Sequence, residues 1–170
     1  MWILLFIVTF LFMEWFAWFL HKYVMHGPLW ILHEDHHTPR PHRKWQLNDF
    51  FAFFFAVPSF LFILFDHLYS MPLLGAVGYG IMAYGAAYFF VHEVLIHRRL
   101  KFMTGVNHWY FEALNRAHKI HHSRKTKEGT ENFGMLWVPM NYFRASLKKF
   151  NRAGLNIKNQ DRTLKLKKTR

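Results

Sequence analysis

The chain of 170 residues contains no cysteine. It therefore has no disulfide framework, no iron–sulfur cluster and no thiolate metal site of the zinc-finger kind. Basic residues are scarce in the first 97 residues, which hold only four of the 22 Lys and Arg. Acidic residues are few throughout, with ten Asp and Glu in the whole chain. The chain is instead rich in aromatic side chains, with 20 Phe and seven Trp, and in histidine, with 13. The length fits one domain.

Three segments have the length and composition of membrane-spanning helices: residues 2–20, 50–65 and 71–91. The first carries one charge, Glu14, and the other two carry none. At about 1.5 Å per residue the second is short for a hydrocarbon core of about 30 Å, so we expect it to tilt or to thin the bilayer. Three buried core helices are the alternative, but so small a soluble domain cannot enclose all three. The sequence predicts an all-α integral membrane protein.

The distribution of charge predicts the orientation. The first segment lacks the basic start and the cleavage site of a signal peptide, so we treat it as a span. All 22 Lys and Arg fall in residues 21–49 and 92–170, which three crossings place on the same side. The positive-inside rule then puts the N-terminus outside and both basic parts, as a histidine-rich helical cap, in the cytoplasm of a multi-pass protein of the cell membrane.

Three features in or near the spans need separate explanations. Residues 133–143 are apolar, but the run is short and Pro139 interrupts it, so we expect an interfacial or re-entrant piece rather than a fourth span. Glu14 is either functional or a carboxyl near the cytoplasmic end that is protonated or paired with a histidine. The small residues of the third span are expected to let helices approach closely. They include the glycines at positions 75, 78, 80 and 85.

Ten of the 13 histidines fall into four clusters with a repeated order, HX4H and HXXHH and then both again. The clusters are His21 and His26; His33, His36 and His37; His92 and His97; and His118, His121 and His122. On an α-helix the positions i, i+3 and i+4 share one face, so the three rings of each HXXHH cluster can converge on a metal. The other three histidines, His42, His67 and His108, lie outside the motifs.

The HX4H pairs are less easily explained, because residues i and i+5 lie about 140° apart on a regular helix. Both rings can serve one cluster only if the helix end unwinds; otherwise each binds a different metal. Gly27 and Pro28 permit such an end after His26. No comparable breaker follows His97 until Gly105.

The clusters are expected at one membrane face, because His21 begins where the first span ends and His92 begins where the third ends. Histidines satisfied singly in a core would not gather in this way. Imidazole suits Zn, Cu, Fe and Ni, and ten ligands are too many for one ion, so we expect two ions. Asp49 and Glu93 are candidates to accept N–H bonds from the ligating rings.

Two further acids near the second cluster, Glu34 and Asp35, have the same possible role. A solvated surface position explains them equally well.

This series of motifs resembles the integral-membrane fatty acid hydroxylase superfamily, and the sequence between the motifs resembles its branch of bacterial non-haem β-carotene hydroxylases. The matching stretches, within residues 14–138, are 21–27, 36–40, 47–49, 83–85 into 91–92, 116–122, 127–129 and 133–134. The chain departs from the branch at Glu93, where Asp is frequent, and at residues 28–32, which are usually richer in Gly and Trp. These changes could reshape the substrate entrance.

The resemblance implies a di-iron, O2-dependent monooxygenase. It would hydroxylate C3 of each β-ionone ring of β-carotene and give zeaxanthin through β-cryptoxanthin, with the ten histidines as ligands of two iron ions and a ferredoxin-type electron donor. The residues agree, because no side chain alone can insert oxygen into an unactivated C–H bond. An apolar carotene can arrive only through the bilayer. Aromatic side chains of the spans can line its path, although each alone is better explained as an ordinary lipid-facing or interhelical group.

The end of the chain is basic: residues 144–170 hold ten Lys or Arg and one acid, Asp161. We expect this tail to be disordered or to lie on the membrane surface, held by anionic lipid at about 1 kcal/mol per basic residue. Docking of an acidic electron donor is the less favoured alternative. Nucleic acid is not expected, because the tail is tethered to a membrane. Residues 1–143 then form the membrane-embedded hydroxylase domain.

Other functions use the same residues. A hydroxylase, desaturase or ketolase acting on another lipid would share the motif chemistry. A metal transporter or metal-binding membrane protein is a more distant alternative, because transport sites tend to lie near the bilayer midplane on broken helices. A haem cytochrome is disfavoured, since HXXHH has no role in axial ligation.

Overall fold

Helices make up the regular structure of this computed structural model, which describes residues 1–38, 45–100, 103 and 106–168, with side chains through Gly154. The elements are α1 (Trp2–Phe19), η1 (Leu20–Met25), α2 (Trp30–His37), η2 (Leu47–Phe50), α3 (Phe51–Tyr69), α4 (Pro72–Phe89), η3 (Phe90–Ile96), α5 (Trp109–His121) and α6 (Met140–Lys168). The prediction of an all-α fold is confirmed.

Three helical stretches are long and apolar enough to cross a membrane: Trp2–Met25, Leu47–Tyr69 and Pro72–Ile96. The three predicted spans are therefore confirmed, with one correction. The second stretch has 23 residues, so it is long enough to span without thinning the bilayer. Its helix continues through the polar residues Asp66 and His67 and ends where Ser70 adopts a left-handed conformation, with φ 53°.

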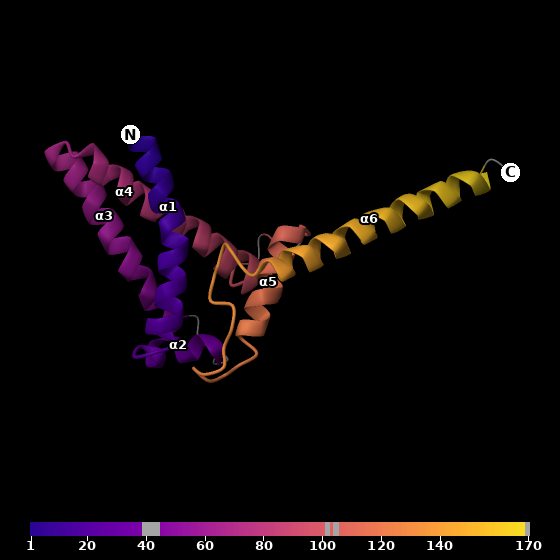
Figure 1. The fold of residues 1–170 in the computed structure, drawn as a ribbon, viewed down its shortest axis with the longest axis horizontal. Helices are drawn as coiled ribbons and strands as arrows, with labels where there is room; N and C mark the ends of the chain where they lie inside the picture. Colours follow the sequence, from indigo (N-terminus) through magenta and orange to yellow (C-terminus); the bar gives the residue numbers. More distant parts are fainter. Residues whose placement is uncertain (39–44, 101–102, 104–105, 169–170) are drawn as a thin grey trace.

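The middle helix of the bundle is α4, which packs against both α1 and α3 (Figure 1). Glycine permits this packing: a Cβ on Gly80 would lie 2.8 Å from the Cβ of Thr9 in α1, and a Cβ on Gly78 would lie 2.8 Å from Ile63 in α3. Gly85 differs, because a Cβ there would meet nothing within 4 Å. The expectation of close packing is therefore wrong at this one glycine.

The first and third spans end in π-helical turns, η1 and η3. The N–H of His26 donates to the carbonyl of His21 at 3.0 Å, and the N–H of His97 donates to the carbonyl of His92 at 2.9 Å. A bond from residue i+5 to residue i widens the turn and brings these two residues to the same side of the helix. The ring centres lie 5.2 Å apart in the first pair and 4.5 Å apart in the second. The helix end therefore widens instead of unwinding.

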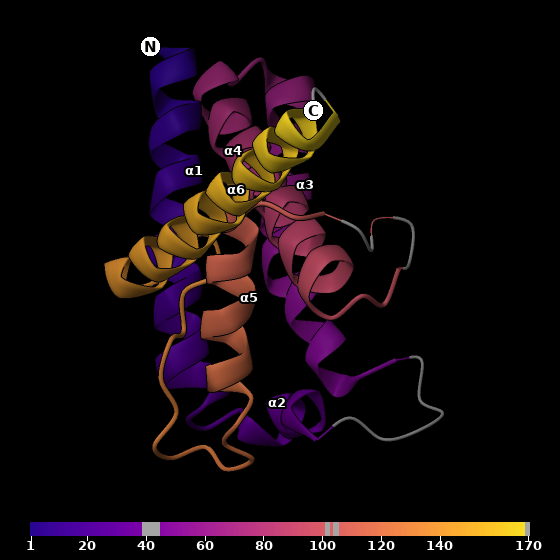
Figure 2. The same ribbon diagram turned by 90° about the vertical axis from the view of Figure 1, so that its right-hand side faces the viewer.

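A cap covers the ends of α1 and α4, formed by α2, α5 and the loop between α5 and α6 (Figure 2). Helix α5 packs against η3 and α6 through buried side chains that include Val91, Leu114 and Phe143. Helix α2 packs against η1 and η2. The turn between α3 and α4 lies at the far end of the bundle (Figure 1). All four histidine clusters thus share one end.

Glu14 ties the loop after α5 to the first span. Its carboxylate accepts bonds of 2.8–3.1 Å from the backbone N–H groups of residues 135–137, and the hydroxyl of Tyr84 donates to it at 2.8 Å. Residues 133–139 therefore run beside α1 without forming a helix. Among the described residues no fourth helix could span a membrane, in agreement with an interfacial or re-entrant piece. Of the alternatives for Glu14, pairing with a histidine is wrong, since backbone amides and a tyrosine are its partners in the described structure.

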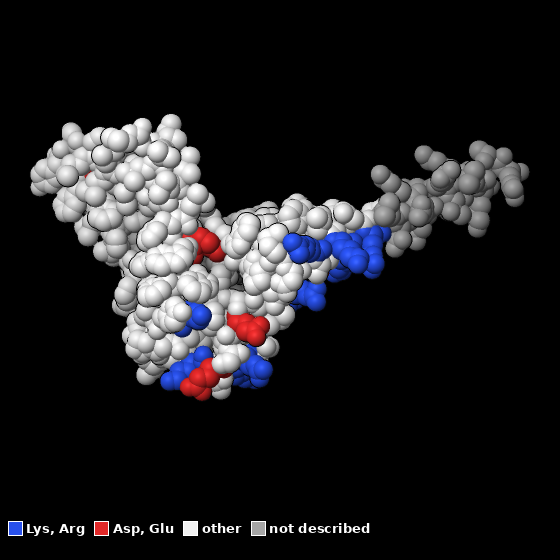
Figure 3. Space-filling view, in the orientation of Figure 1, with Lys and Arg blue, Asp and Glu red and all other residues white. Residues whose placement is uncertain are grey.

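Helix α6 carries the basic tail. It leaves the cap beside α5 and runs outward from the bundle (Figure 1), with Lys and Arg side chains along its described part (Figure 3). Near its start Phe143 and Ser146 are buried, and Lys149 forms an ion pair with Glu112 of α5. The tail is helical as far as Lys168, and the expected boundary at residue 143 falls inside this helix. Side chains beyond residue 154, and residues 169–170, lie outside the described part.

Candidate metal centre

The ten predicted histidines lie together at the end of the bundle where α1 and α4 finish. Nine of them form two groups whose ligand nitrogen atoms lie within 4.8 Å of one another. The first group is His21, His26, His33, His37 and His121, and the second group is His36, His97, His118 and His122. The tenth, His92, lies against the second group, since its ring centre is 4.5 Å from that of His97 and 4.7 Å from that of His36.

Each ring of the first group is held through its Nδ1 atom, at 2.6–3.3 Å from an oxygen. Four of these oxygens are backbone carbonyls of the loop after α5, and the fifth is the side-chain amide oxygen of Asn48 in η2. A carbonyl oxygen can only accept, so Nδ1 carries the hydrogen in every ring. The pairs are His21 with Phe133, His26 with Lys127, His37 with Arg124, His121 with Glu131 and His33 with Asn48.

This arrangement leaves the Nε2 lone pairs of the first group directed at one another. Nε2 of His33 lies 3.1 Å from Nε2 of His21 and 3.2 Å from that of His37, and the Nε2 atoms of His26 and His121 lie 3.3 Å apart. With the hydrogen on Nδ1, neither nitrogen of such a pair has a hydrogen to donate, so these contacts repel. A cation between the rings removes the repulsion. The residues therefore fit a transition metal ion of the kind that imidazole binds.

The second group also contains ring nitrogen atoms without a suitable hydrogen-bond partner among the described residues. The Nε2 atoms of His97 and His118 lie 2.9 Å apart. The Nε2 atoms of His36 and His122 are buried and have no hydrogen-bond partner among the described residues. Nδ1 of His36 lies 2.9 Å from the side-chain oxygen of Gln46, which fixes its hydrogen on that side. Buried polar atoms without partners are rare in proteins, and a second metal ion would satisfy these.

The two groups are neighbours. The rings of His37 and His122 stack with their centres 4.5 Å apart, and those of His118 and His121 lie 5.7 Å apart. Ions bound in the two groups would therefore be close to each other. Because His21 and His26 belong to the same group, the geometry favours one metal rather than two for the first HX4H pair.

The two carboxylates predicted to support the rings are placed differently. Glu93 accepts a bond of 2.6 Å from the Nδ1–H of His92, which is the contact that this role requires. Asp49 accepts from the backbone N–H of Gln46 at 3.1 Å and from the guanidinium of Arg99 at 2.7 and 2.9 Å. Arg99 also donates to Glu93 at 2.9 Å. Asp49 thus touches no ligating ring in the described contacts and reaches the second group through Gln46 and, by way of Arg99, through Glu93. The bridging Arg99 was not predicted.

Asp35 is buried, so the alternative of a solvated surface position is wrong for this residue, whereas Glu34 is exposed. The carboxylate of Asp35 accepts N–H bonds from Leu47 at 2.7 Å and from Asn48 at 3.4 Å. It thereby holds the η2 turn that presents the amide of Asn48 to His33. The roles of Asn48 and Gln46 were not predicted, although amide side chains close to a histidine motif are a usable signal. The loop carbonyls carry no signal in residue type.

Burial keeps these rings neutral. It lowers the pKa of His26 and His97 from 6.5 to about 4 and that of His121 to about 3; neighbouring histidines, and Arg99 in the case of His97, add to the effect. Burial likewise lowers the pKa of His33 and His36 well below the ordinary value. The neutral ring is the form that binds metal, so both groups are in their metal-binding form at neutral pH.

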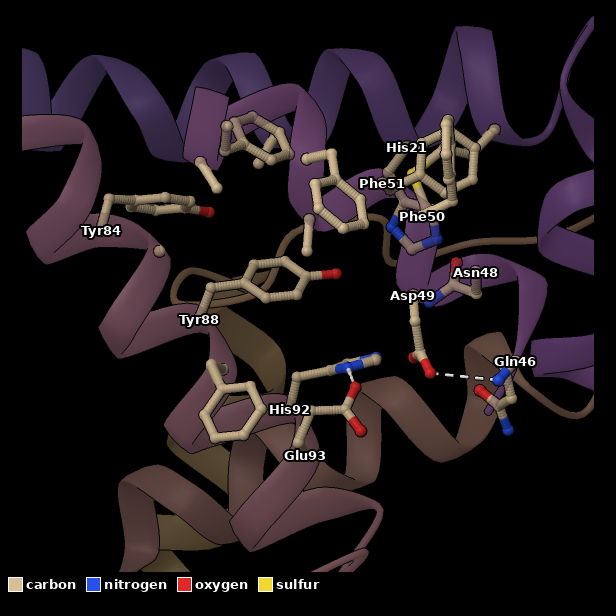
Figure 4. A pocket seen from close by; sticks show the side chains of 18 of the residues that line it. His21, Gln46, Asn48, Asp49, Phe50, Phe51, Tyr84, Tyr88, His92 and Glu93 are labelled. Atoms are coloured by element: carbon tan, nitrogen blue, oxygen red, sulfur yellow. Dashed lines mark hydrogen bonds and ion pairs between the residues drawn. The ribbon is translucent and has the colours of Figure 1, made fainter. Parts of the chain in front are cut away.

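A cavity of about 1450 Å³ opens beside both groups (Figure 4). Apolar side chains of α3 and α4 form most of its wall, and it reaches His21 of the first group and His92 beside the second. Figure 4 shows the hydroxyl of Tyr88 directed into this space from α4. The hydroxyl of Ser59, which also lines the cavity, is already used because it donates to the carbonyl of Gly78 at 2.8 Å. The arrangement can hold an apolar molecule with one end next to both groups.

Comparison with known proteins identifies the family of the chain. The profile of the fatty acid hydroxylase family matches residues 6–144. A protein of Pantoea ananas named beta-carotene hydroxylase is 40% identical over 132 residues, which cover 78% of this chain and 74% of the relative. A protein of the same name from Pseudescherichia vulneris is 38% identical, and the match covers 79% of this chain and 76% of the relative. Another, from Paracoccus sp. (strain PC1), is 34% identical, and the match covers 80% of this chain and 83% of the relative. No solved structure matches the chain significantly. The chain belongs to the fatty acid hydroxylase family.

Proposed function

We propose that this membrane protein is an oxygenase that hydroxylates C3 of each β-ionone ring of β-carotene, giving zeaxanthin by way of β-cryptoxanthin. One observation carries the proposal: a largely apolar cavity between membrane-spanning helices ends beside His21 and His92, which belong to the two histidine clusters that close these spans. The names of the bacterial relatives point to the same substrate.

We assign one iron ion to each histidine group, with the ten motif histidines as the ligands and O2 as the co-substrate. Iron held by imidazole supplies the redox chemistry that no side chain provides. The chain's own residues prepare the site. The loop carbonyls and Asn48 fix the hydrogen on Nδ1 and direct each Nε2 inward. Burial excludes water and keeps the rings neutral.

The wall of the cavity suits a hydrocarbon. β-Carotene has no group that forms hydrogen bonds, so apolar contact and shape alone must hold it. The hydroxyls of Ser59 and Tyr84 both donate to protein oxygens, so neither donates into the cavity. A carotene with one ring beside His21 and His92 would extend along α3 and α4 toward the middle of the membrane. This placement exposes one ring at a time to the metal groups.

The proposal includes an orientation and two partners. The histidine groups and the C-terminus face the cytoplasm and the N-terminus faces outside, because the basic residues gather on the histidine side. A ferredoxin-type protein delivers the electrons that each hydroxylation consumes. The basic residues of α6 bind the anionic surface of the bilayer.

Expression in a host that makes β-carotene, followed by pigment chromatography, tests the proposal. β-Cryptoxanthin and zeaxanthin are the expected products. His118→Ala should abolish them at an unchanged amount of membrane protein, whereas His67→Ala, at the far end of α3, should not. Unaltered β-carotene in cells that contain the protein would contradict the proposal. A keto or desaturated product would assign a different reaction of the same family.

A further inference from the structure

The cavity beside the histidine groups is open on its membrane side. Four large apolar side chains of α3 and α4 line it and are at the same time exposed on the outside of the bundle. They are Phe53 (59% exposed) and Phe60 (62%) on α3, and Met82 (51%) and Phe89 (52%) on α4. All four lie in membrane-spanning stretches, so the surroundings that they meet are lipid.

Each of the two helices presents a row of large, small and large residues along this opening. The rows are Phe53, Ala56 and Phe60 on α3, and Met82, Gly85 and Phe89 on α4. Both rows have the spacing i, i+3, i+7, which puts all three residues on one helix face. Both small residues also line the cavity. The side chains along the opening are therefore smallest at Ala56 on α3 and at Gly85 on α4.

The contacts near the turn between α3 and α4 place the two small residues at the same depth. A Cβ on Gly78 would touch Ile63, so these two positions face each other in the antiparallel pair. Ala56 lies seven residues, or about two helical turns, from Ile63 on the histidine side of α3. Gly85 lies the same distance from Gly78 on the histidine side of α4. The small residues of the two rows, Ala56 and Gly85, therefore lie opposite each other. Large side chains of both rows flank them on either side along the helices.

Packing does not explain the glycine at position 85. A Cβ there would meet nothing within 4 Å, whereas at Gly75, Gly78 and Gly80 it would come within 3 Å of a neighbouring helix. Glycine inside a helix is unfavourable relative to alanine, so a glycine without a packing role needs another reason. The opening that it leaves in the cavity wall is such a reason.

We propose that Ala56 and Gly85 form the centre of a window between α3 and α4, through which a rod-shaped apolar hydrocarbon passes from the bilayer into the cavity. The inference rests on the proposed function and adds the route of the substrate. While one ring lies beside His21 and His92, the polyene chain occupies the window and the far ring stays in lipid. Gly85 thereby determines which molecules can enter, because any larger side chain narrows the window.

The absence of cysteine from the chain allows a test on the folded protein. Gly85→Cys is purified, reconstituted in lipid vesicles with β-carotene and then modified with benzyl methanethiosulfonate. This reagent adds a bulky group through a disulfide bond that a reductant removes. Ala86→Cys is the matched control, because Ala86 is exposed on the same turn of α4 but does not line the cavity. Mass spectrometry measures the extent of modification.

Modification of Gly85→Cys is expected to lower the rate of hydroxylation about tenfold or more. It should also lower the amount of β-carotene that the purified protein retains, and reductant should restore both. Modified Ala86→Cys should keep its rate and its pigment. Gly85→Ala adds only a Cβ, which has room, so it should lower the rate and the retained pigment far less than the benzyl group does. Complete modification of Gly85→Cys without any loss, or an equal loss in both variants, would overturn the window.

Pigment retention separates this inference from the proposed function. If the unmodified protein retains β-carotene and makes no hydroxylated product, the proposed function fails, and the effect of modification on retention still decides whether the window exists. If the unmodified protein retains no carotene and hydroxylates none, both ideas fail.

Discussion

The Nδ1–H of His21 donates to the backbone carbonyl of Phe133 at 2.9 Å, across 112 positions of the sequence. The ring of Phe133 also packs edge-on against His21, His26 and His121, with ring centres 5.1–5.4 Å apart. One residue of the loop after α5 thus contacts three members of the first group and lines the cavity as well. The position of this loop therefore sets the geometry of the first group.

Replacing Glu14 with alanine is expected to detach that loop. Three consecutive backbone N–H groups would lose their acceptor, each at a cost on the order of 1–3 kcal/mol where it stays buried. Phe133 would then lose its fixed position beside His21. We expect a lower thermal unfolding midpoint in detergent and a lower iron content. Tyr84→Phe, which removes one bond to the same carboxylate, should have the smaller effect. A wild-type midpoint and iron content in Glu14→Ala would show that the loop is held elsewhere.

Substitution of single histidines should remove metal group by group. His33→Ala lies in the first group and His118→Ala in the second, so each should lose one ion and all hydroxylation. His108→Ala is the control, because His108 lies outside both groups and accepts a bond from the backbone of Tyr110 at the start of α5. Metal analysis of the purified proteins measures the outcome. Full iron content in His33→Ala would exclude the first group as a site.

Arg99→Ala should loosen the second group without removing a ligand. Arg99 joins Asp49 to Glu93, and Glu93 in turn holds the Nδ1–H of His92. Loss of such outer contacts typically weakens metal binding about 10–100-fold. Arg99→Lys keeps the charge without the two-pronged contact and should be intermediate. Transfer of iron to a chelator provides the measurement. Equal transfer rates in the wild type and Arg99→Ala would argue that the bridge has no such role.

The lowered histidine pKa values predict that the metal-free protein loses stability in acid. The pKa of His26 and of His97 is about 4 in the folded chain, against 6.5 for an ordinary histidine. Between these values the unfolded chain binds protons that the folded chain does not, so stability falls as the pH drops from 6.5 toward 4. Above 6.5 these groups have no effect. Unfolding midpoints of the metal-free protein at about pH 7.5 and about pH 5 should therefore differ, with the lower midpoint in acid. Equal midpoints would contradict this.

The spans and the histidine motifs could be predicted because both are local patterns. Runs of apolar residues fix the spans, and the i, i+3, i+4 spacing of His118, His121 and His122 fixes their shared face. That the clusters share one end of the bundle could be predicted because His21 and His92 directly follow the first and third spans. These features depend on neighbouring residues alone.

The parts that could not be predicted depend on distant or backbone groups. No residue type marks the π-turn that aligns His21 with His26, and nothing in a side chain shows that the carbonyl of Arg124 will hold His37. The contact of Glu14 with residues 135–137 joins segments far apart in the sequence. Gly85 could not be distinguished from the packing glycines near it in the sequence, because the space around a glycine depends on residues of other helices.

Anomalous scattering at the iron edge from crystals of the iron-loaded protein tests the central claim most directly. We expect one iron peak among the Nε2 atoms of the first group, which is His21, His26, His33, His37 and His121. A second peak should lie among those of His36, His97, His118 and His122, with His92 alongside. A single peak, or iron bound outside these rings, would contradict the central claim.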